Sequence, residues 1–146
     1  MAEQVGVELA RRGAVVLTGG LGGAMEAACR GAKRGGGTTI AILPGDDRAD
    51  ANRWVDVAVP TGLGEARNAL LVRAADAVVA VAGEFGTLSE IALALRLGKP
   101  VVGLATWELA HDGRPVAAVV DAATPAEAAE KAIALATARR APPTGS

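Results

Sequence analysis

The sequence predicts an α/β fold in which helices cover both faces of a doubly wound parallel sheet. Short apolar runs bounded by Gly, Pro or Asp alternate along the chain with longer segments of helical periodicity. Most of the short runs are apolar throughout, which is typical of strands buried on both faces. At 146 residues the chain has the length of one domain. We assign this domain to residues 1–140 and interpret residues 141–146, Ala-Pro-Pro-Thr-Gly-Ser, as a disordered tail.

The first predicted element is a helix at residues 2–12, in which Val5 and Leu9 share one face and charged residues occupy the rest. A doubly wound fold usually opens with a strand, so we expect a strand upstream of this helix. Further helices are predicted at 22–34, 64–75, 87–97 and 125–139. Strands are predicted at 14–18, 38–43, 55–59, 77–82, 100–104 and 116–120.

Glycine and proline mark the ends of these helices. Gly13, Gly35 and Gly98 stand just after helical segments, where a left-handed residue often ends a helix. Pro125 follows Thr124 and takes the first position of the last helix, where its missing N–H costs nothing. Glycine and proline therefore mark where the predicted helices begin and end.

Composition and charge exclude two classes of partner. Fifteen basic and sixteen acidic residues give a net charge of −1, and 2% aromatic residues leave little surface for stacking on bases. No apolar run approaches the roughly 18 residues of a membrane-spanning helix. We therefore expect neither nucleic acid nor a membrane as partner. A single cysteine, Cys29, and the lack of a secretory signal favour the cytoplasm, with Cys29 as a small buried thiol.

A first glycine-rich turn lies between a predicted strand and a predicted helix, at Thr18 to Met25. Such a turn lets backbone N–H groups approach an anion at the positive end of the helix. The segment matches neither the dinucleotide pattern G-x-G-x-x-G nor a P-loop. It can equally be a tight turn with close packing. Its glycines are Gly19, Gly20, Gly22 and Gly23.

A second glycine-rich turn, Ala82 to Glu90, also joins a strand to a helix. Gly83 and Gly86 could expose N–H groups, and the Thr87 hydroxyl could donate to a phosphate. The spacing Thr87-x-x-Glu90 is also that of a capping box, in which Thr and Glu satisfy free N–H groups of the helix. By spacing alone, Glu90 reads as a cap rather than as a catalytic residue.

A third segment, between the two turns, adds a guanidinium to the same edge of the sheet. Thr61 to Asn68 enters a helix and contains Arg67, which could pair with a phosphate or be an ordinary surface arginine. The carboxyl ends of parallel strands share one edge, so this segment and both glycine turns should gather around one crevice. That convergence favours a binding site for a phosphorylated ligand.

Together these segments resemble the Rossmann-like superfamily of the Lonely Guy phosphoribohydrolases and the molybdenum-cofactor carrier proteins, often mislabelled lysine decarboxylases. The first turn, ending in Met25, matches a glycine-rich turn of that superfamily. Ala82 to Glu90 matches P-G-G-x-G-T-x-x-E in part. Arg67 and Glu90 stand 23 positions apart (90 − 67), as the paired catalytic residues of the enzymes do. The short sequences Gly-Glu-Ala-Arg-Asn and Ile-Leu-Pro-Gly are more similar to those of the carrier-like branch.

The departures from the enzyme pattern bear on function. Glu84 replaces a glycine and places a carboxylate beside the phosphate cradle, and Asn68 replaces a lysine. The resemblance implies a nucleotide-binding domain, possible catalytic roles for Arg67 and Glu90, and homodimers or higher homo-oligomers. It implies ligand contacts from a set of turn residues: Gly19, Gly20, Gly22, Gly23, Met25, Gly83, Gly86 and Thr87.

Our leading hypothesis is a binding protein for a phosphorylated nucleotide or pterin-type ligand, such as a nucleoside monophosphate or the molybdenum cofactor, with no cofactor required. The first alternative is a phosphoribohydrolase that releases base and ribose 5-phosphate from a nucleoside monophosphate. The second is a structural or partner-binding module without a ligand. We expect no metal site, because His111 is the only histidine and lies in a predicted exposed turn. None of the three lysines suits a pyridoxal phosphate enzyme.

Overall fold

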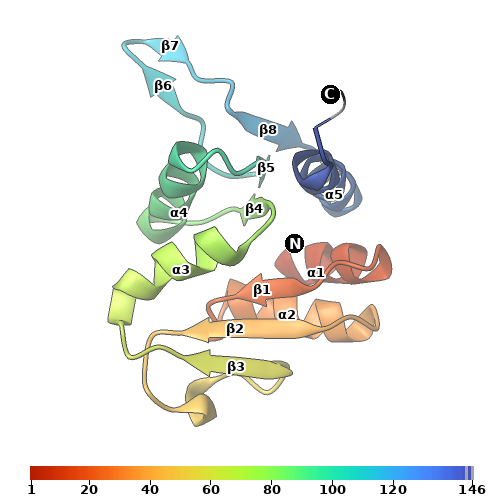
Figure 1. Ribbon diagram of the computed structural model, residues 1–146, viewed down its shortest axis with the longest axis vertical. Helices are drawn as coiled ribbons and strands as arrows, with labels where there is room; N and C mark the ends of the chain where they lie inside the picture. Colours follow the sequence, from red (N-terminus) through yellow and green to blue (C-terminus); the bar gives the residue numbers. More distant parts are fainter. Residues whose placement is uncertain (144, 146) are drawn as a thin grey trace.

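The computed structural model describes residues 1–143 and 145 and confirms the α/β fold (Figure 1). Five α-helices and two short 3-10 helices alternate with eight strands in the described part of the chain. The helices are α1 (Ala2–Arg11), α2 (Ala24–Arg34), α3 (Arg67–Ala74), α4 (Phe85–Arg96) and α5 (Pro125–Arg140), with η1 (Arg48–Asp50) and η2 (Gly64–Ala66). The strands are β1 (Val16–Thr18), β2 (Thr39–Leu43), β3 (Val57–Pro60), β4 (Val78–Val81), β5 (Val101–Leu104), β6 (Ala110–His111), β7 (Arg114–Pro115) and β8 (Val119–Ala122).

The parallel strands form two three-stranded sheets instead of the one continuous sheet that the sequence predicts. Their orders are β1-β2-β3 and β4-β5-β8, and every pairing within them is parallel. β1 and β4 face each other across the middle of the molecule (Figure 1) without sharing hydrogen bonds in the described structure. The chain therefore has the doubly wound arrangement, interrupted at its centre.

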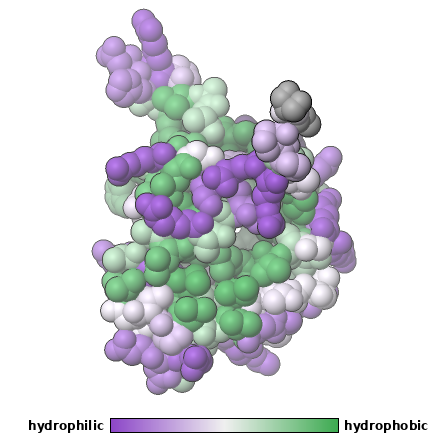
Figure 2. Space-filling view, in the orientation of Figure 1, coloured by the Kyte–Doolittle hydropathy of each residue, from purple (hydrophilic) through white to green (hydrophobic). Residues whose placement is uncertain are grey.

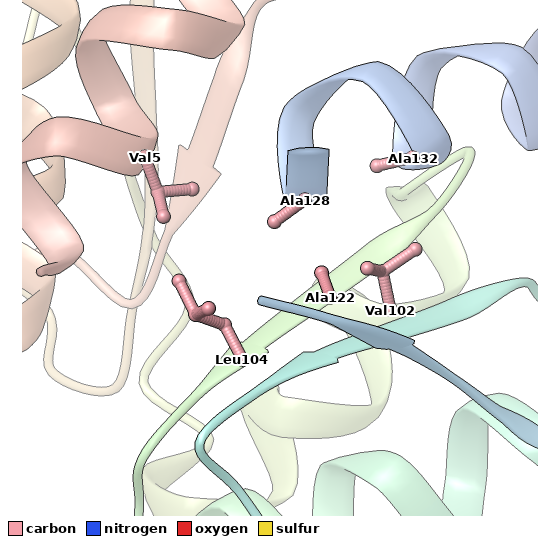
Figure 3. Close-up of a cluster of buried hydrophobic side chains, with 6 residues drawn as sticks. All are labelled: Val5, Val102, Leu104, Ala122, Ala128 and Ala132. Carbon is pink, nitrogen blue, oxygen red and sulfur yellow. The ribbon is translucent and has the colours of Figure 1, made fainter. Parts of the chain in front are cut away.

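Helices cover both faces and make the three layers. α1 packs against α2 and α5 on one face, while α3 packs against α4 on the other. One core cluster joins α1 to the second sheet, and Figure 3 shows Val5 of α1 directed toward Leu104 and Ala128. A second cluster lies beneath α3 and α4, around Val72 and Ile91. α1 and α3 each contact both halves, so together they hold the two sheets in place.

Element boundaries lie within two residues of the predicted ones except at the starts of α3 and β8. Residues 64–66, predicted as the start of α3, form η2 instead. β8 begins at Val119, three residues later than predicted, because the preceding residues form the β6–β7 hairpin. Asp112 and Gly113 take positive φ angles of 51° and 70° at its tip, as a two-residue turn requires. The left-handed residue after α2 is Gly36, not Gly35, whose φ is −79°.

The chain after α5 contains no helix or strand at residues 141–143 and 145. The predicted disordered tail also includes residues 144 and 146, which lie outside the described residues. Across the residues that are described, no helix combines the length and hydropathy needed to cross a membrane.

Candidate functional site

The first glycine turn is held in shape by the residue that precedes it. Thr18 is 8% exposed, and its Oγ1 accepts a hydrogen bond from the Gly20 N–H at 3.0 Å. The same hydroxyl lies 3.3 Å from Sγ of Cys29, which is fully buried as predicted. Gly20 has a φ of +79°, and a Cβ there would lie 2.5 Å from Cβ of Ala41 on β2. The turn therefore needs glycine for packing and for conformation at this position.

Asn52 supports this turn from the loop after β2, and the sequence analysis missed it. Its N–H donates to the Gly20 carbonyl at 2.8 Å, and its Nδ2 donates to the Leu21 carbonyl at 3.0 Å. Asn52 lies 32 positions after Gly20, in a segment without periodicity, so no local pattern could identify it. Asn52 therefore binds the carbonyl groups of the turn, not its N–H groups.

Arg67 opens α3 and is buried against the first turn, so it is no ordinary surface arginine. Arg67 as a whole residue is 9% exposed, and its Nε has no hydrogen-bond partner among the described residues. A Cβ placed on Gly19 would lie 2.0 Å from a terminal guanidinium nitrogen of Arg67 and 2.7 Å from Sδ of Met25. Gly19 thus makes the room that Arg67 and Met25 occupy. Burial lowers the pKa of Arg67, and nearby Glu90 opposes this shift.

The second glycine turn places Thr87 inside α4, so the capping-box interpretation of Thr87 and Glu90 is wrong. α4 begins at Phe85, and its N-cap is Glu84; in this described segment no side chain caps the helix. A Cβ on Gly83, whose φ is +102°, would lie 2.2 Å from Oγ1 of Thr87. The hydroxyl therefore packs on the turn, and Glu90 is left free for another role.

The Thr124 box at α5 shows what a real cap looks like in this fold. Oγ1 of Thr124 accepts from the Glu127 N–H at 3.1 Å, and Glu127 accepts from the Ala123 N–H at 2.8 Å. The same four-residue spacing thus gives two outcomes. At α4 the helix begins two residues earlier than Thr87, which removes both reciprocal bonds.

Glu90 faces Arg67 in a half-buried position. Burial raises the pKa of the Glu90 carboxyl, and the Arg67 guanidinium opposes the rise. Within the described chain, no hydrogen bond or ion pair of 4 Å or less joins the two side chains, although each influences the other's charge. A guanidinium and a carboxylate can both bind a third group placed between them when they lie close together without a hydrogen bond to each other.

A pair of aromatic rings lies on the rim of the second turn. Phe85 is 77% exposed, and its ring centroid lies 5.6 Å from that of Trp107. Trp107 Nε1 donates to the Glu84 carbonyl at 3.1 Å, which ties the loop after β5 to the loop after β4. Ala82 and Ala105, the residues that follow these strands, have positive φ angles of 49° and 50°. Non-glycine residues held in this conformation often mark functional loops.

A cavity of about 790 Å³ reaches the candidate site. At one end it is lined by Thr18, Gly19, Met25, Thr87 and Glu90, which confirms that the two turns converge. Six predicted residues do not line this cavity: Gly20, Gly22, Gly23, Arg67, Gly83 and Gly86. Arg67 lies beside it, against Gly19. Gly22 and Gly23 precede α2, and Gly86 lies in the first turn of α4; in the described structure, a Cβ on any of them would meet open space.

These open glycines leave two helix N-termini accessible to an anion. The first N–H groups of a helix have no partner within it and carry partial positive charge. α2 and α4 both start at the carboxyl edge of the strands, beside β1 and β4. The described residues hold no group of three or more His, Cys, Asp or Glu side chains able to bind a metal ion. The site therefore suits a ligand with phosphate oxygens.

A family model and a relative both match most of this chain. The model of the SLOG cluster4 family matches residues 1–135. An uncharacterized protein of Archaeoglobus fulgidus is 45% identical over 104 residues, which are 71% of this chain and 68% of the relative.

Two solved structures superpose on most of the chain. The molybdenum cofactor binding protein from Rippkaea orientalis does so with a TM-score of 0.79 at 38% identity, over 92% of this chain and 85% of that one. The Moco carrier protein from Chlamydomonas reinhardtii does so with a TM-score of 0.81 at 39% identity, over 94% and 86%. These likenesses confirm the predicted resemblance to the carrier-like branch of the superfamily and its Rossmann-like fold.

Proposed function

The chain belongs to the SLOG cluster4 family, and we propose from its site and its relatives that it is a cytoplasmic carrier of a phosphorylated pterin, the molybdenum cofactor. The likeness to proteins named for binding and carrying that cofactor supports this ligand. A nucleoside monophosphate shares the two chemical features that the site addresses, a phosphate and a planar ring. It is therefore the competing ligand in any test.

The observation that carries the proposal is the buried guanidinium of Arg67. A buried polar group without a partner costs free energy, of the order of 1–3 kcal/mol and more for a charged one. The Arg67 Nε has no partner in the described chain, and Gly19 is packed against the guanidinium. A phosphate at this position would supply the missing acceptors, and Arg is suited to bind it through two parallel hydrogen bonds.

The two glycine turns and the aromatic rim complete the proposed site. The open N-termini of α2 and α4, at Gly22, Gly23 and Gly86, would donate to phosphate oxygens. The exposed face of Phe85, supported by Trp107, would stack on the planar ring of the ligand. The carboxylate of Glu84 stands exposed at the start of α4 and disfavours a highly charged polyphosphate there.

The test is a titration of the purified chain with molybdopterin, followed by pterin fluorescence, and in parallel with AMP, followed by thermal shift. We expect saturable binding of molybdopterin that weakens about tenfold or more in Arg67→Lys, because lysine keeps the charge but loses the planar fork. Arg73→Lys, an exposed change on the same helix, is the matched control and should bind normally. The absence of saturable binding to both ligands would contradict the proposal.

A hydrolase remains the second candidate because of the Arg67 and Glu90 pairing. Arg67 would orient the phosphate or ribose, and Glu90 would bind ribose hydroxyls and stabilise the positive charge that develops on the sugar, or activate water. The raised pKa of the half-buried Glu90 supports such a role. Release of ribose 5-phosphate from AMP or N6-isopentenyl-AMP, lost in Glu90→Gln, would establish this activity. A rate no faster than that of Glu90→Gln would reject it.

We also propose that the protein forms homodimers. Several large apolar side chains are exposed on β3 and on the segment that leads through α3, and hydrophobic residues gather on this face in Figure 2. They are Val57, Val59, Leu63 and Leu70. Burying them between two copies would remove apolar area from water. Sedimentation equilibrium of the chain and of Leu70→Asp decides the question, since a wild-type monomer would contradict the proposal.

A further inference from the structure

The cavity extends far beyond the candidate ligand site, along the line between β1 and β4. We call this part the slot: it runs from Gly13 and Ala14, before β1, to Thr18 and Glu90, and both β1 and β4 line it along their whole lengths. Most of its remaining walls are apolar side chains of α1, α3 and α5. At its carboxyl end stand Thr18, Thr87 and Glu90, whereas at its amino end Asp76 and Arg140 are already paired with each other at 3.3 Å.

The two strands that border the slot each present one unpaired edge to it. The Val16 N–H donates to the Thr38 carbonyl on the β2 side, so in β1 the N–H and carbonyl of Leu17 point the opposite way, to the slot. On β4, the N–H groups of Val78 and Ala82 donate to the β5 side. The polar backbone groups of Val79 and Val81 therefore face the slot as well.

This arrangement fits one further strand better than it fits a small molecule. Backbone N–H and carbonyl groups are obligatory hydrogen-bonding groups, and the two facing edges carry them at strand spacing. A strand parallel to β1 and β4 would pair with both and join the two sheets into one. Its side chains would point to the apolar faces that α1 and α5 cover on one side and α3 covers on the other.

The position of α1 indicates where such a strand comes from. α1 ends next to the amino end of β1, and its first turns pack near the carboxyl ends of β5 and β8, where Val5 contacts the cluster of Leu104 and Ala122. Ala2 itself lines the slot. A strand in the slot that continued into Ala2 would make a β-α-β crossover to β1, the ordinary connection between parallel strands.

We propose that the slot is the seat of a further parallel strand, an extended apolar segment of the same polypeptide that continues directly into α1. The carboxyl end of this strand would reach Gly19 and Glu90, so it would form the floor of the candidate ligand site. The pairing itself depends on backbone edges alone and holds whether or not the ligand is a pterin.

Amide hydrogen exchange tests the pairing without any ligand. Two versions are compared with the chain itself: one extended at Met1 by Thr-Val-Ala-Val-Ile-Gly, and a control with the same length in which both valines are replaced by proline. We expect the amides of Leu17, Val79 and Val81 to exchange about tenfold or more slowly in the first version only. The already bonded amides of Val16 and Val78 report any change in global stability.

Three results would overturn the proposal. Slow exchange of Leu17 and Val79 in the chain alone at every protein concentration would mean that the two edges close on each other. Slowing with rising concentration of the chain alone would mean that a second copy fills the slot. An N-terminal peptide beginning at Met1 in the protein isolated from its native cells would exclude an extended segment of the same polypeptide. A longer native N-terminus with the slow exchange supports it.

Discussion

Gly19 and Gly22, three positions apart in the first turn, have different surroundings: Gly19 is closely packed and Gly22 faces open space. Gly19 leaves room for Arg67 and Met25, whereas nothing described lies within 4 Å of a Cβ on Gly22. We expect Gly19→Ala to displace the guanidinium and to weaken ligand binding about tenfold or more, since charge-assisted hydrogen bonds contribute about 1.5–3 kcal/mol. Gly22→Ala, which keeps its own N–H and leaves the Arg67 guanidinium in place, is the comparison variant of the same turn, and Arg73→Lys is the control outside the site.

The measurement is the dissociation constant of molybdopterin for the wild type and both variants, by fluorescence titration. Equal weakening in the two variants would show that general loosening of the turn, not the position of Arg67, determines affinity. Circular dichroism and the urea midpoint of Gly19→Ala show whether the variant folds before its affinity is compared.

The charge of Glu90 also makes a prediction about pH. Burial raises its pKa above the ordinary value of 4.5, so the folded state holds this proton more tightly than the unfolded state does. Its contribution to stability is greatest below the ordinary pKa and is lost as pH rises through the raised pKa. Relative to wild type, Glu90→Gln should therefore become more stable as pH rises through that window.

Glu127 supplies a control of opposite sign. Lys131 and the Ala123 N–H lower its pKa below 4.5, so its contribution is present above the ordinary pKa and is lost as pH falls through the lowered one. Urea unfolding of wild type, Glu90→Gln and Glu127→Gln from acid to neutral pH measures both slopes. A pH-independent difference between wild type and Glu90→Gln would contradict the raised pKa.

At the scale of elements, the two Thr-x-x-Glu segments should respond in opposite ways to loss of the hydroxyl. Thr124 caps α5, so Thr124→Ala should lower the free energy of unfolding by about 1 kcal/mol and leave ligand affinity unchanged. Thr87 caps nothing and faces the cavity, so Thr87→Ala should weaken binding about threefold to tenfold with little effect on stability. Urea unfolding and ligand titration of both variants distinguish a cap from a ligand contact; the reverse pattern would restore the capping interpretation of Thr87.

Local sequence patterns predicted most elements because each depends on its own residues. Apolar runs and glycine boundaries placed β2, β4 and β5 within one residue of their observed ends. The shift of β8 arose because the hairpin at Asp112 and Gly113 uses residues that read as a strand. The start of α4 was missed because Glu84, a residue without a side-chain cap bond, takes the N-cap.

The site was predictable only in part, because its residues meet through tertiary structure. The two glycine turns and the Arg67 segment were grouped because parallel strands end at one edge, whereas Arg67 and Glu90 were paired through the resemblance to the Lonely Guy superfamily. Asn52 and Trp107 were missed because they lie in other loops and reach the turns through hydrogen bonds to turn carbonyls. The unpaired state of Arg67 depends on burial, which sequence spacing does not report.

At the scale of the whole molecule, the two half-sheets are joined by side-chain packing: α1 packs on α2 and α5, and α3 contacts both β2 and α4. Val5 is 4% exposed and packs with residues of β5, β8 and α5, as Figure 3 shows. In the described structure β1 and β4 share no hydrogen bonds. The cooperative unfolding of the two halves therefore depends on a few side-chain contacts. Each half contains one tryptophan, Trp54 before β3 and Trp107 after β5, so each half can be followed separately.

We expect Val5→Ala to lower the free energy of unfolding by about 2 kcal/mol, because two buried methyl groups are lost and a gap remains. It should also separate the unfolding transitions of the halves, with the β1–β3 half unfolding at lower urea, since both larger core clusters contain residues of the β4–β8 half. Trp54→Phe and Trp107→Phe backgrounds isolate each fluorescence signal. Val116→Ala, which removes methyl groups from a residue 38% exposed and outside the proposed dimer face, is the control and should leave the transitions coincident. Coincident transitions in Val5→Ala would show that the halves are coupled through contacts other than α1.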